Sequence, residues 1–196
     1  METTTWKIYT RKGDKGQTRI LSGEKVAKDD ARVKAYGAVD EFQSHLGLAR
    51  ALTGVNSLKS ILHTIQEDLF VAGAELASIP EALPRLQKRI DSENTQQLES
   101  WIDQFAMRFG LPRHFVVPGK SPDSAALHVA RAVCRRCERL IVMLNRPTGV
   151  YDALLVYFNR LSDLLFVLAW SSEVIAIIEE VVREVIAADV YGGKRA

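Results

Sequence analysis

The residues most able to do chemistry cluster in one arginine-rich stretch, RAVCRRCERL, which covers residues 131–140. Apolar side chains within and around it recur every three or four positions, as on the buried face of a helix in a bundle. This spacing predicts one helix over residues 123–145. Its apolar seam consists of Leu127, Ala130, Cys134, Cys137, Ile141 and Leu144.

Charged side chains form a second stripe on the same predicted helix. At 100° per residue, Arg131, Arg135 and Glu138 border the apolar seam. Arg136 and Arg139 point further outward. A run of charges is commonly a solvated helix face. However, two arginines one turn apart repel each other, and their planar guanidinium groups match phosphate oxygens. The stripe therefore fits two interpretations, a solvated face or an anion-binding surface.

The two cysteines, Cys134 and Cys137, are three positions apart on the predicted core seam. The CxxC spacing also occurs in redox and zinc sites. Redox motifs, however, begin a helix after a strand, and a zinc site needs two further ligands that the sequence does not place nearby. We therefore expect both thiols to pack in the core and the chain to provide no metal site.

The segment over residues 6–30 lacks helical periodicity and is rich in glycine, hydroxyl and cationic side chains. Glycine lets backbone N–H groups approach a ligand closely, and cations attract phosphate. The segment fits either a phosphate-binding loop or a flexible arm. It is not a Walker A loop, because no GKS or GKT follows. Its candidate ligand-binding residues are Thr10, Lys12, Gly13, Lys15, Gly16, Thr18, Arg19, Ser22, Gly23 and Lys28.

The composition is that of an ordinary soluble globular protein. The chain has 196 residues, of which 47% are apolar, and a formal net charge of +2. These values predict a single domain and argue against a strongly basic nucleic-acid binder. The first residues are polar, so we expect no secretory signal. The most apolar stretch, residues 154–178, is interrupted by charged residues, which argues against a membrane span. A reducing cytoplasmic location fits best.

Five segments have helical periodicity. The signals that bound them include Gly54, the Pro80 and Pro84 pair, and an acidic cap at Asp91. Asp123 or Ser124 is expected to cap the arginine-rich helix. The predicted core faces of the other four helices are Ala35, Val39, Phe42, Leu46 and Ala49; Leu58, Leu62, Ile65, Leu69, Ala72 and Leu76; Leu98, Ile102, Phe105 and Phe109; and Leu154, Phe158, Leu161, Leu165 and Leu168.

Several residues beside these faces fit more than one role. Asp40 could be a solvated carboxylate or the partner of an arginine, and Asn159 could bind a ligand or a neighbouring helix. Phe115 lies in a predicted nonhelical loop, where an aromatic ring can line a ligand pocket. The last helix is predicted to run from residue 151 to 188. Its apolar stripe is longer than one short bundle needs, which predicts contact with another subunit. The extra residues are Val174, Ile177, Ile178, Val181, Val182, Val185 and Ile186.

Five stretches, taken in order, resemble the PduO-type ATP:cob(I)alamin adenosyltransferases. They are YTRKGDKGQT (9–18), GEKVAKDDARVKAYGAVDEF (23–42), FVVPGK (115–120), ARAVCRRCER (130–139) and YFNRLSDLLFVLAW (157–170). The resemblance covers nearly the whole chain. It implies an all-α five-helix bundle that assembles as a homotrimer with active sites between subunits.

The chain length predicts a single domain over residues 1–196. Within it we expect a nonhelical segment over 1–30, which the resemblance assigns to ATP binding, a helical bundle over 31–188 and a frayed tail over 189–196. In this chain, Lys120 stands where relatives often have glycine, and Cys137 replaces a common alanine. Phe42 and Gln43 stand where leucine and asparagine are frequent.

The implied reaction transfers the 5′-deoxyadenosyl group of ATP to cob(I)alamin and releases triphosphate. The substrate's cobalt is the nucleophile, so no nucleophilic side chain is needed. Fixed cations and Mg²⁺ would meet the charge on the triphosphate. The expected ligands are ATP, Mg²⁺ and a reduced corrinoid. A cobalamin reductase and an adenosylcobalamin-dependent enzyme are candidate partners, and neither nucleic acid nor membrane is expected.

Two alternatives belong to other classes. The first is a noncatalytic ATP-sensing helical module that acts on a partner protein. The second is a purely structural bundle, or a carboxylate metal bundle, which is disfavoured because no Glu-x-x-His pair occurs on facing helices.

The resemblance assigns roles to individual residues. Arg131 matches an arginine that pairs across the interface with an aspartate, here Asp40. Phe115 matches a phenylalanine that displaces the lower axial ligand of the corrin. Together with Arg135, these residues form the expected catalytic set. The expected nucleotide-binding residues are Thr10, Arg11, Lys12, Gly13, Thr18, Arg19, Lys28, Arg135, Arg136, Cys137, Glu138, Arg139 and Asn159.

Overall fold

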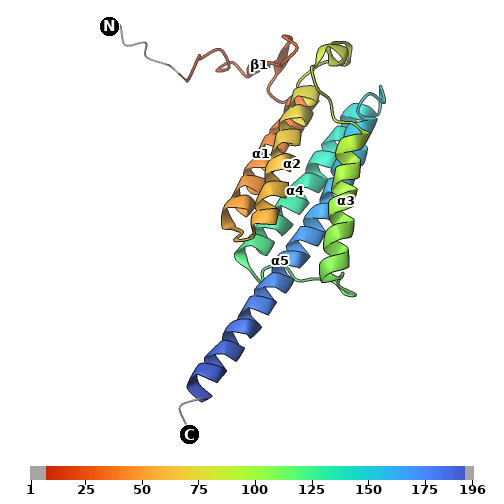
Figure 1. Cartoon of the computed structure of the whole chain (residues 1–196). Helices are drawn as coiled ribbons and strands as arrows, with labels where there is room; N and C mark the ends of the chain where they lie inside the picture. The colour runs from red at the N-terminus through yellow and green to blue at the C-terminus, as the bar shows by residue number, and fades with distance from the viewer. Residues whose placement is uncertain (1–7, 193–196) are drawn as a thin grey trace, which may run out of the picture.

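The computed structural model describes residues 8–192 and consists mainly of five long helices (Figure 1). A short 3-10 helix, η1 (Pro80–Arg85), follows the second of them, where the prolines were expected to interrupt the pattern. The predicted all-α fold is confirmed. The five helices are α1 (Ala31–Leu52), α2 (Asn56–Leu76), α3 (Ser92–Phe109), α4 (Pro122–Asn145) and α5 (Asp152–Gly192).

The centre of the bundle is α4, which packs against α1 and α5, while α2 packs against α1 and α3 against α5. All the residues of the predicted core faces of α1, α2 and α5 are buried. Of the predicted core face of α3, only Leu98 is buried, whereas Ile102, Phe105 and Phe109 are partly exposed. The prediction for α3 was too generous because this helix packs extensively against α5 alone.

Capping residues fix where the helices begin. The Asp30 carboxylate accepts a hydrogen bond from Arg32 N at 2.8 Å, and Asp91 forms a capping box with Asn94. The cap of α4 is Ser121, not Asp123 or Ser124 as predicted. Pro occupies the first position of α4, where its missing N–H costs nothing, so the helix begins earlier than its apolar period indicates.

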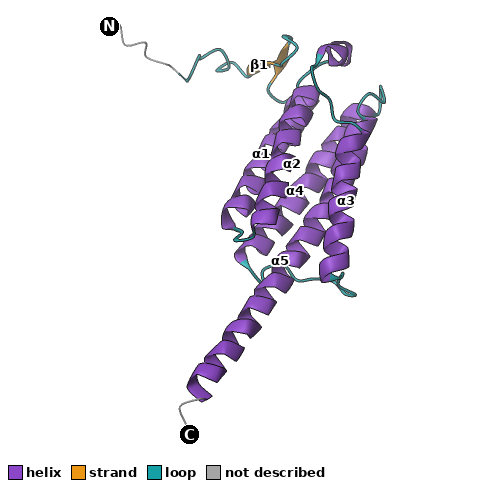
Figure 2. Cartoon of the chain, viewed as in Figure 1, coloured by secondary structure: helices purple, strands orange, loops and turns teal. Residues whose placement is uncertain are grey.

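The N-terminal segment is not entirely a loop. Strands β1 (Gln17–Arg19) and β2 (Lys25–Ala27) pair antiparallel, with Arg19 opposite Lys25 (Figure 2). Gly23 has φ +104 in the connecting turn, a conformation that favours glycine. The Leu21 N–H donates to Ala77 O at 2.8 Å, which attaches the hairpin to the end of α2. The sequence missed these strands because each is three residues long.

The hairpin and the loop after α3 lie at opposite ends of the bundle (Figure 1). The hairpin lies where α1 begins and α2 ends. The loop over residues 110–121 lies where α3 ends and α4 begins.

The last helix, α5, continues well past the bundle (Figure 1). Its apolar residues there are exposed, for example Ile178 at 52% and Val185 at 59%. By length and composition alone, Asp152–Ala187 could span a membrane. However, 56% of its most apolar window is buried inside the bundle, as in the core helix of a water-soluble protein. The predicted subunit contact of the exposed stripe stays a prediction.

Candidate functional site

The N-terminal hairpin and the turn before it enclose a cavity of about 630 Å³ whose lining is strongly cationic. A Cβ on Gly13 would lie only 3.1 Å from Nζ of Lys28, so glycine lets this ammonium group close over the turn. The backbone N–H of Lys28 donates to Gly16 O at 2.9 Å, which fixes the lysine against the loop. We call this cavity the cationic cradle. Its lining residues are Thr10, Lys12, Gly13, Gln17, Thr18, Arg19, Lys25 and Lys28.

The cationic cradle contains six of the seven N-terminal residues that the sequence assigned to ATP. Arg11 does not line the cradle. Its backbone has a positive φ of 58°, and its guanidinium carbon lies 5.5 Å from the centre of the Tyr9 ring. Sequence reasoning missed Gln17 and Lys25. Lys25 stands opposite Arg19 in the strand pair, so recognition of the hairpin would have identified it.

Lys28 allows a direct test of the cradle. Lys28→Ala is expected to weaken ATP binding about tenfold, because a cation–phosphate hydrogen bond is worth roughly 1.4 kcal/mol in an accessible site. Titration calorimetry with ATP measures the change. The control is Lys59→Ala, which removes an equally exposed cation near the start of α2. Equal affinities of the two variants would show that the cradle does not bind the nucleotide.

The charged stripe of α4 is only partly free to receive an anion. The guanidinium of Arg136 is paired with Glu41 of α1. This hydrogen bond holds the pKa of Glu41 below, and that of Arg136 above, its ordinary value. Arg135 and Arg139 are exposed, and neither makes an ion pair within the described part of the chain. These two arginines are therefore better placed than Arg136 to bind phosphate.

Glu138 and Asn159 lie beside each other on α4 and α5. The amide Nδ2 of Asn159 donates to Oε1 of Glu138 at 3.1 Å. The Asn159 side chain is exposed, so this bond leaves its side-chain amide oxygen, Oδ1, available to a ligand. The contact with a neighbouring helix that the sequence allowed for Asn159 is confirmed.

The thiol of Cys137 is completely buried, so its assignment to the nucleotide is not supported as a side-chain contact. Burial raises the pKa of Cys137 to about 12 and that of Cys134 well above its ordinary value. Both thiols are therefore protonated at neutral pH. The predicted core packing of both cysteines is confirmed, and the Cys134 thiol donates to Phe158 O at 3.5 Å.

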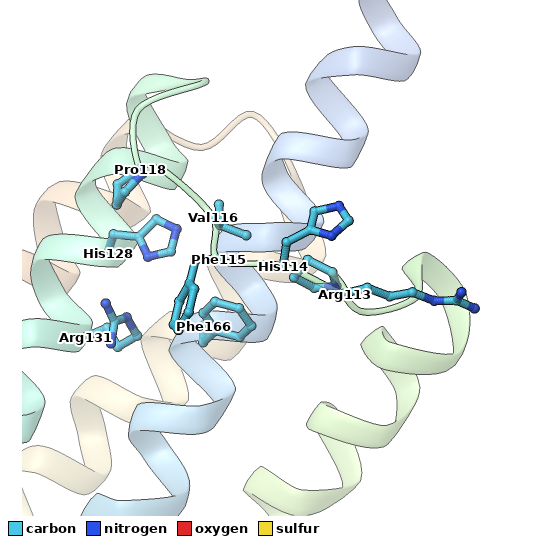
Figure 3. A pocket seen from close by; sticks show the side chains of 9 residues that line it. Arg113, His114, Phe115, Val116, Pro118, His128, Arg131 and Phe166 are labelled. Carbon is cyan, nitrogen blue, oxygen red and sulfur yellow. The ribbon is translucent and has the colours of Figure 1, made fainter.

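A second cavity, of about 610 Å³, lies beside the loop after α3 (Figure 3). The Phe115 ring is fully exposed and forms one wall. Arg131 and His128 of α4 and Phe166 of α5 line the same cavity. We call it the Phe115 pocket. Sequence reasoning identified Phe115 and Arg131 but missed His128, which precedes Arg131 by one turn on the same face, and Phe166.

The loop of the Phe115 pocket is tied to the α5 extension. The ammonium of Lys120 lies 3.6 Å from a carboxylate oxygen of Glu180. Glycine at position 120 could not make this contact. Lys120 thus adds one exposed ion pair between the loop and α5.

Asp40 and Arg131 do not meet within one chain. Asp40 is exposed and lines a groove of about 380 Å³ between α1 and α2. This groove shares no lining residue with the Phe115 pocket. The hairpin that lines the cationic cradle and the loop that lines the Phe115 pocket lie at opposite ends of the bundle (Figure 1). A site that uses all these residues needs more than one chain.

Among the side chains that the structure describes, residues 8–187, no cluster of three or more His, Cys, Asp or Glu could hold a metal ion. Among the described residues that line the cationic cradle, Thr10 and Thr18 offer hydroxyl oxygens but none offers a carboxylate. A cation in this cradle would therefore arrive with the phosphates of a nucleotide.

The chain belongs to the cobalamin adenosyltransferase family, whose model matches residues 8–172. It is 47% identical over 164 residues to a corrinoid adenosyltransferase from Citrobacter freundii, which covers 84% of this chain and 93% of that protein. It is 38% identical over 178 residues to the corrinoid adenosyltransferase PduO of Salmonella typhimurium, covering 91% of this chain but only 53% of that longer protein.

Solved structures agree with this assignment. One is a phenylalanine-to-alanine variant of a PduO-type ATP:corrinoid adenosyltransferase from Lactobacillus reuteri, complexed with cobalamin and ATP. Its TM-score is 0.79 at 38% identity, over 85% of this chain and 93% of that chain. An arginine-to-lysine variant from the same organism, complexed with ATP, has a TM-score of 0.76. The α5 extension beyond residue 172 lies outside the family match.

Proposed function

We propose that the protein transfers the 5′-deoxyadenosyl group of ATP to cob(I)alamin and releases triphosphate. Family membership supports this proposal, and so do the relatives that carry the name corrinoid adenosyltransferase. The single observation that carries it in the structure is the presence of two unlike cavities on one chain. The cationic cradle suits a polyphosphate, and the Phe115 pocket, with two aromatic walls, suits an apolar macrocycle.

The reaction is a displacement at the 5′ carbon of ATP. The cobalt of cob(I)alamin donates its electron pair to that carbon, a cobalt–carbon bond forms, and the bond to the triphosphate oxygen breaks. Negative charge grows on the leaving triphosphate, so fixed cations lower the barrier by stabilising this charge. Lys12 and Lys28 of the cradle and Arg135 of α4 are the proposed cations. Mg²⁺ bound by the phosphates would share this role.

The corrinoid side of the site must exclude water from a strongly reducing centre. Phe115 and Phe166 provide apolar surface for this purpose. In the proposed complex, Phe115 occupies the position of the lower axial ligand and leaves cobalt four-coordinate. Full exposure of the Phe115 ring in the free chain leaves it available to a ligand.

The proposed assembly is a homotrimer with active sites between subunits. The separation of the cationic cradle from the Phe115 pocket supports it, because a second chain can bring the two together. The exposed Phe70, at 70%, in the groove beside Asp40 and the bare apolar stripe of α5 offer surface for such contacts. Asp40 of one subunit would pair with Arg131 of the next.

Asp40→Asn tests that pairing. Removal of the charge is expected to lower kcat about tenfold or more, because Arg131 loses the carboxylate that orients it. Steady-state rates with ATP and cob(I)alamin measure the effect. Co-expression of Asp40→Asn with Arg131→Ala provides the control, since a mixed interface restores the original pair in about a quarter of the sites. Absence of any recovery would contradict a pair between subunits.

We further propose a cytoplasmic enzyme that receives reduced corrinoid from a cobalamin reductase and passes its product to an adenosylcobalamin-dependent enzyme. The reduced thiols of Cys134 and Cys137 are consistent with this location.

The phosphorus product distinguishes this function from the ATP-sensing module. Phosphorus NMR of a reaction with ATP and cob(I)alamin is expected to show inorganic triphosphate accumulating in step with consumed ATP. A sensing module would leave ATP intact, and an ATPase would produce ADP and phosphate. Either of these results would overturn the proposal.

A further inference from the structure

His128 is the most unusual polar side chain in the Phe115 pocket. Its ring is only 5% exposed, yet neither ring nitrogen has a hydrogen-bond partner. Its one close aromatic neighbour is Phe166, with ring centres 6.2 Å apart and an edge-on geometry. A buried polar atom without a partner costs about 1–3 kcal/mol, so such atoms are rare in folded proteins.

The unpaired polar atoms are not scattered over the chain. Over residues 8–187, whose side chains the structure describes, six buried side-chain nitrogen or oxygen atoms lack a partner. His128 supplies two of them, and Arg131, Trp170 and Ser172 supply one each, leaving a single atom of Gln66 elsewhere. Except for the Gln66 atom, all of them belong to α4 and α5. His128 and Arg131 line the Phe115 pocket. Trp170 lines another cavity beside the same loop. Arg131 is already assigned to Asp40 of another subunit, so the two nitrogens of His128 are the unpaired atoms of the Phe115 pocket that remain for a ligand.

The protonation state of His128 restricts the kind of ligand. Burial, followed by the positive charge of Arg131, lowers its pKa, and Glu173 only partly opposes them. The ring is therefore neutral at pH 7, with one nitrogen that donates a hydrogen bond and one that accepts. An ionised phosphate group offers acceptors alone and can pair only with the nitrogen that donates. A primary carboxamide can pair with either nitrogen, because it has both a carbonyl oxygen and N–H donors.

We propose that His128 is a binding residue that hydrogen-bonds a peripheral carboxamide of the corrinoid and so helps to select and orient it. This inference rests on the proposed function. Phe115, Phe166 and Val116 line the Phe115 pocket together with His128 (Figure 3). In the proposed complex these apolar side chains contact the face of the macrocycle, and His128 contacts its polar edge. Arg113 and His114 also line the pocket, but their side chains point away from Phe115 and His128 in Figure 3.

The test measures binding without turnover. Cob(II)alamin is titrated anaerobically into ATP-saturated protein and followed by absorbance. His128→Leu is expected to raise the Kd for cob(II)alamin about tenfold and to leave the Kd for ATP unchanged, while His128→Asn, which keeps a donor and an acceptor, restores part of the affinity. His63→Leu is the control, because His63 is exposed on α2. Unchanged corrinoid affinity in His128→Leu would overturn the proposal.

Corrinoids in which one carboxamide is replaced by a methyl ester make the test specific. An ester accepts a hydrogen bond but cannot donate one. At the contacted position, the ester is expected to weaken binding to the original protein severalfold and to have no effect on His128→Leu. Equal ester penalties in both proteins at every position would show that His128 accepts no hydrogen bond from a carboxamide N–H. Since the original protein is assayed for product in parallel, a failure of the proposed function is recognised separately.

Discussion

Replacement of Arg135 by alanine is expected to lower kcat roughly 10- to 150-fold while the protein remains folded. The reason is that Arg135 is exposed on α4 and makes no ion pair within the described residues, so no structural contact is lost. A charge-assisted hydrogen bond to the departing triphosphate contributes about 1.5–3 kcal/mol when it strengthens in the transition state. Single-turnover rates with saturating ATP and cob(I)alamin measure this loss.

The control for Arg135 is Arg146→Ala, which removes an exposed arginine just beyond the end of the same helix. It is expected to retain the original rate. Circular dichroism melts establish that both variants are folded. Full activity of the Arg135→Ala enzyme would show that Arg135 is not a catalytic residue. It would also favour the interpretation of the charged α4 stripe as a solvated helix face.

Phe115→Ala is expected to lower the rate about 10- to 100-fold and to leave ATP affinity nearly intact. The ring is exposed in the free chain, so its removal creates no cavity in the core. On contact with the corrinoid it would bury its full surface, which is worth roughly 1.5–3 kcal/mol. The loss should be greatest at limiting reductant, because a cobalt that keeps its lower ligand is harder to reduce.

Val117→Ala is the matched control, since Val117 is 86% exposed on the same loop but does not line the Phe115 pocket. Reduction of cob(II)alamin on the protein, followed by absorbance at controlled potential, separates the two variants. Identical behaviour of Phe115→Ala and the original protein at limiting reductant would contradict a role at the lower face of cobalt.

The helices were predictable because their signals are local. Apolar residues at spacings of three and four determine the buried faces of α1, α2 and α5, and Asp30 and Asp91 bind the first free N–H groups. The strands were not predictable, because three residues are too few for a period of two to emerge. The weak burial of α3 depends on how many helices pack against it, and the sequence of α3 does not contain that information.

The site was only partly predictable. Lys28 and Gly13 could be assigned to ATP binding from composition and resemblance. The structure adds the reason why they occur together, because a side chain at position 13 would contact the Lys28 side chain. Arg136 shows the limit, because its partner Glu41 is 95 positions earlier in the sequence. His128 was missed since a histidine on a helix gives no sign of unpaired nitrogens until its neighbours are known.

The central claim is that this chain makes adenosylcobalamin. The most direct measurement mixes the purified protein anaerobically with ATP, Mg²⁺ and chemically reduced cobalamin, and follows the absorbance of the light-sensitive cobalt–carbon bond. The account predicts a protein-dependent product that is lost on illumination and reduced in the Arg135→Ala and Phe115→Ala enzymes. Tight ATP binding without any such product would contradict it and would favour an ATP-sensing module.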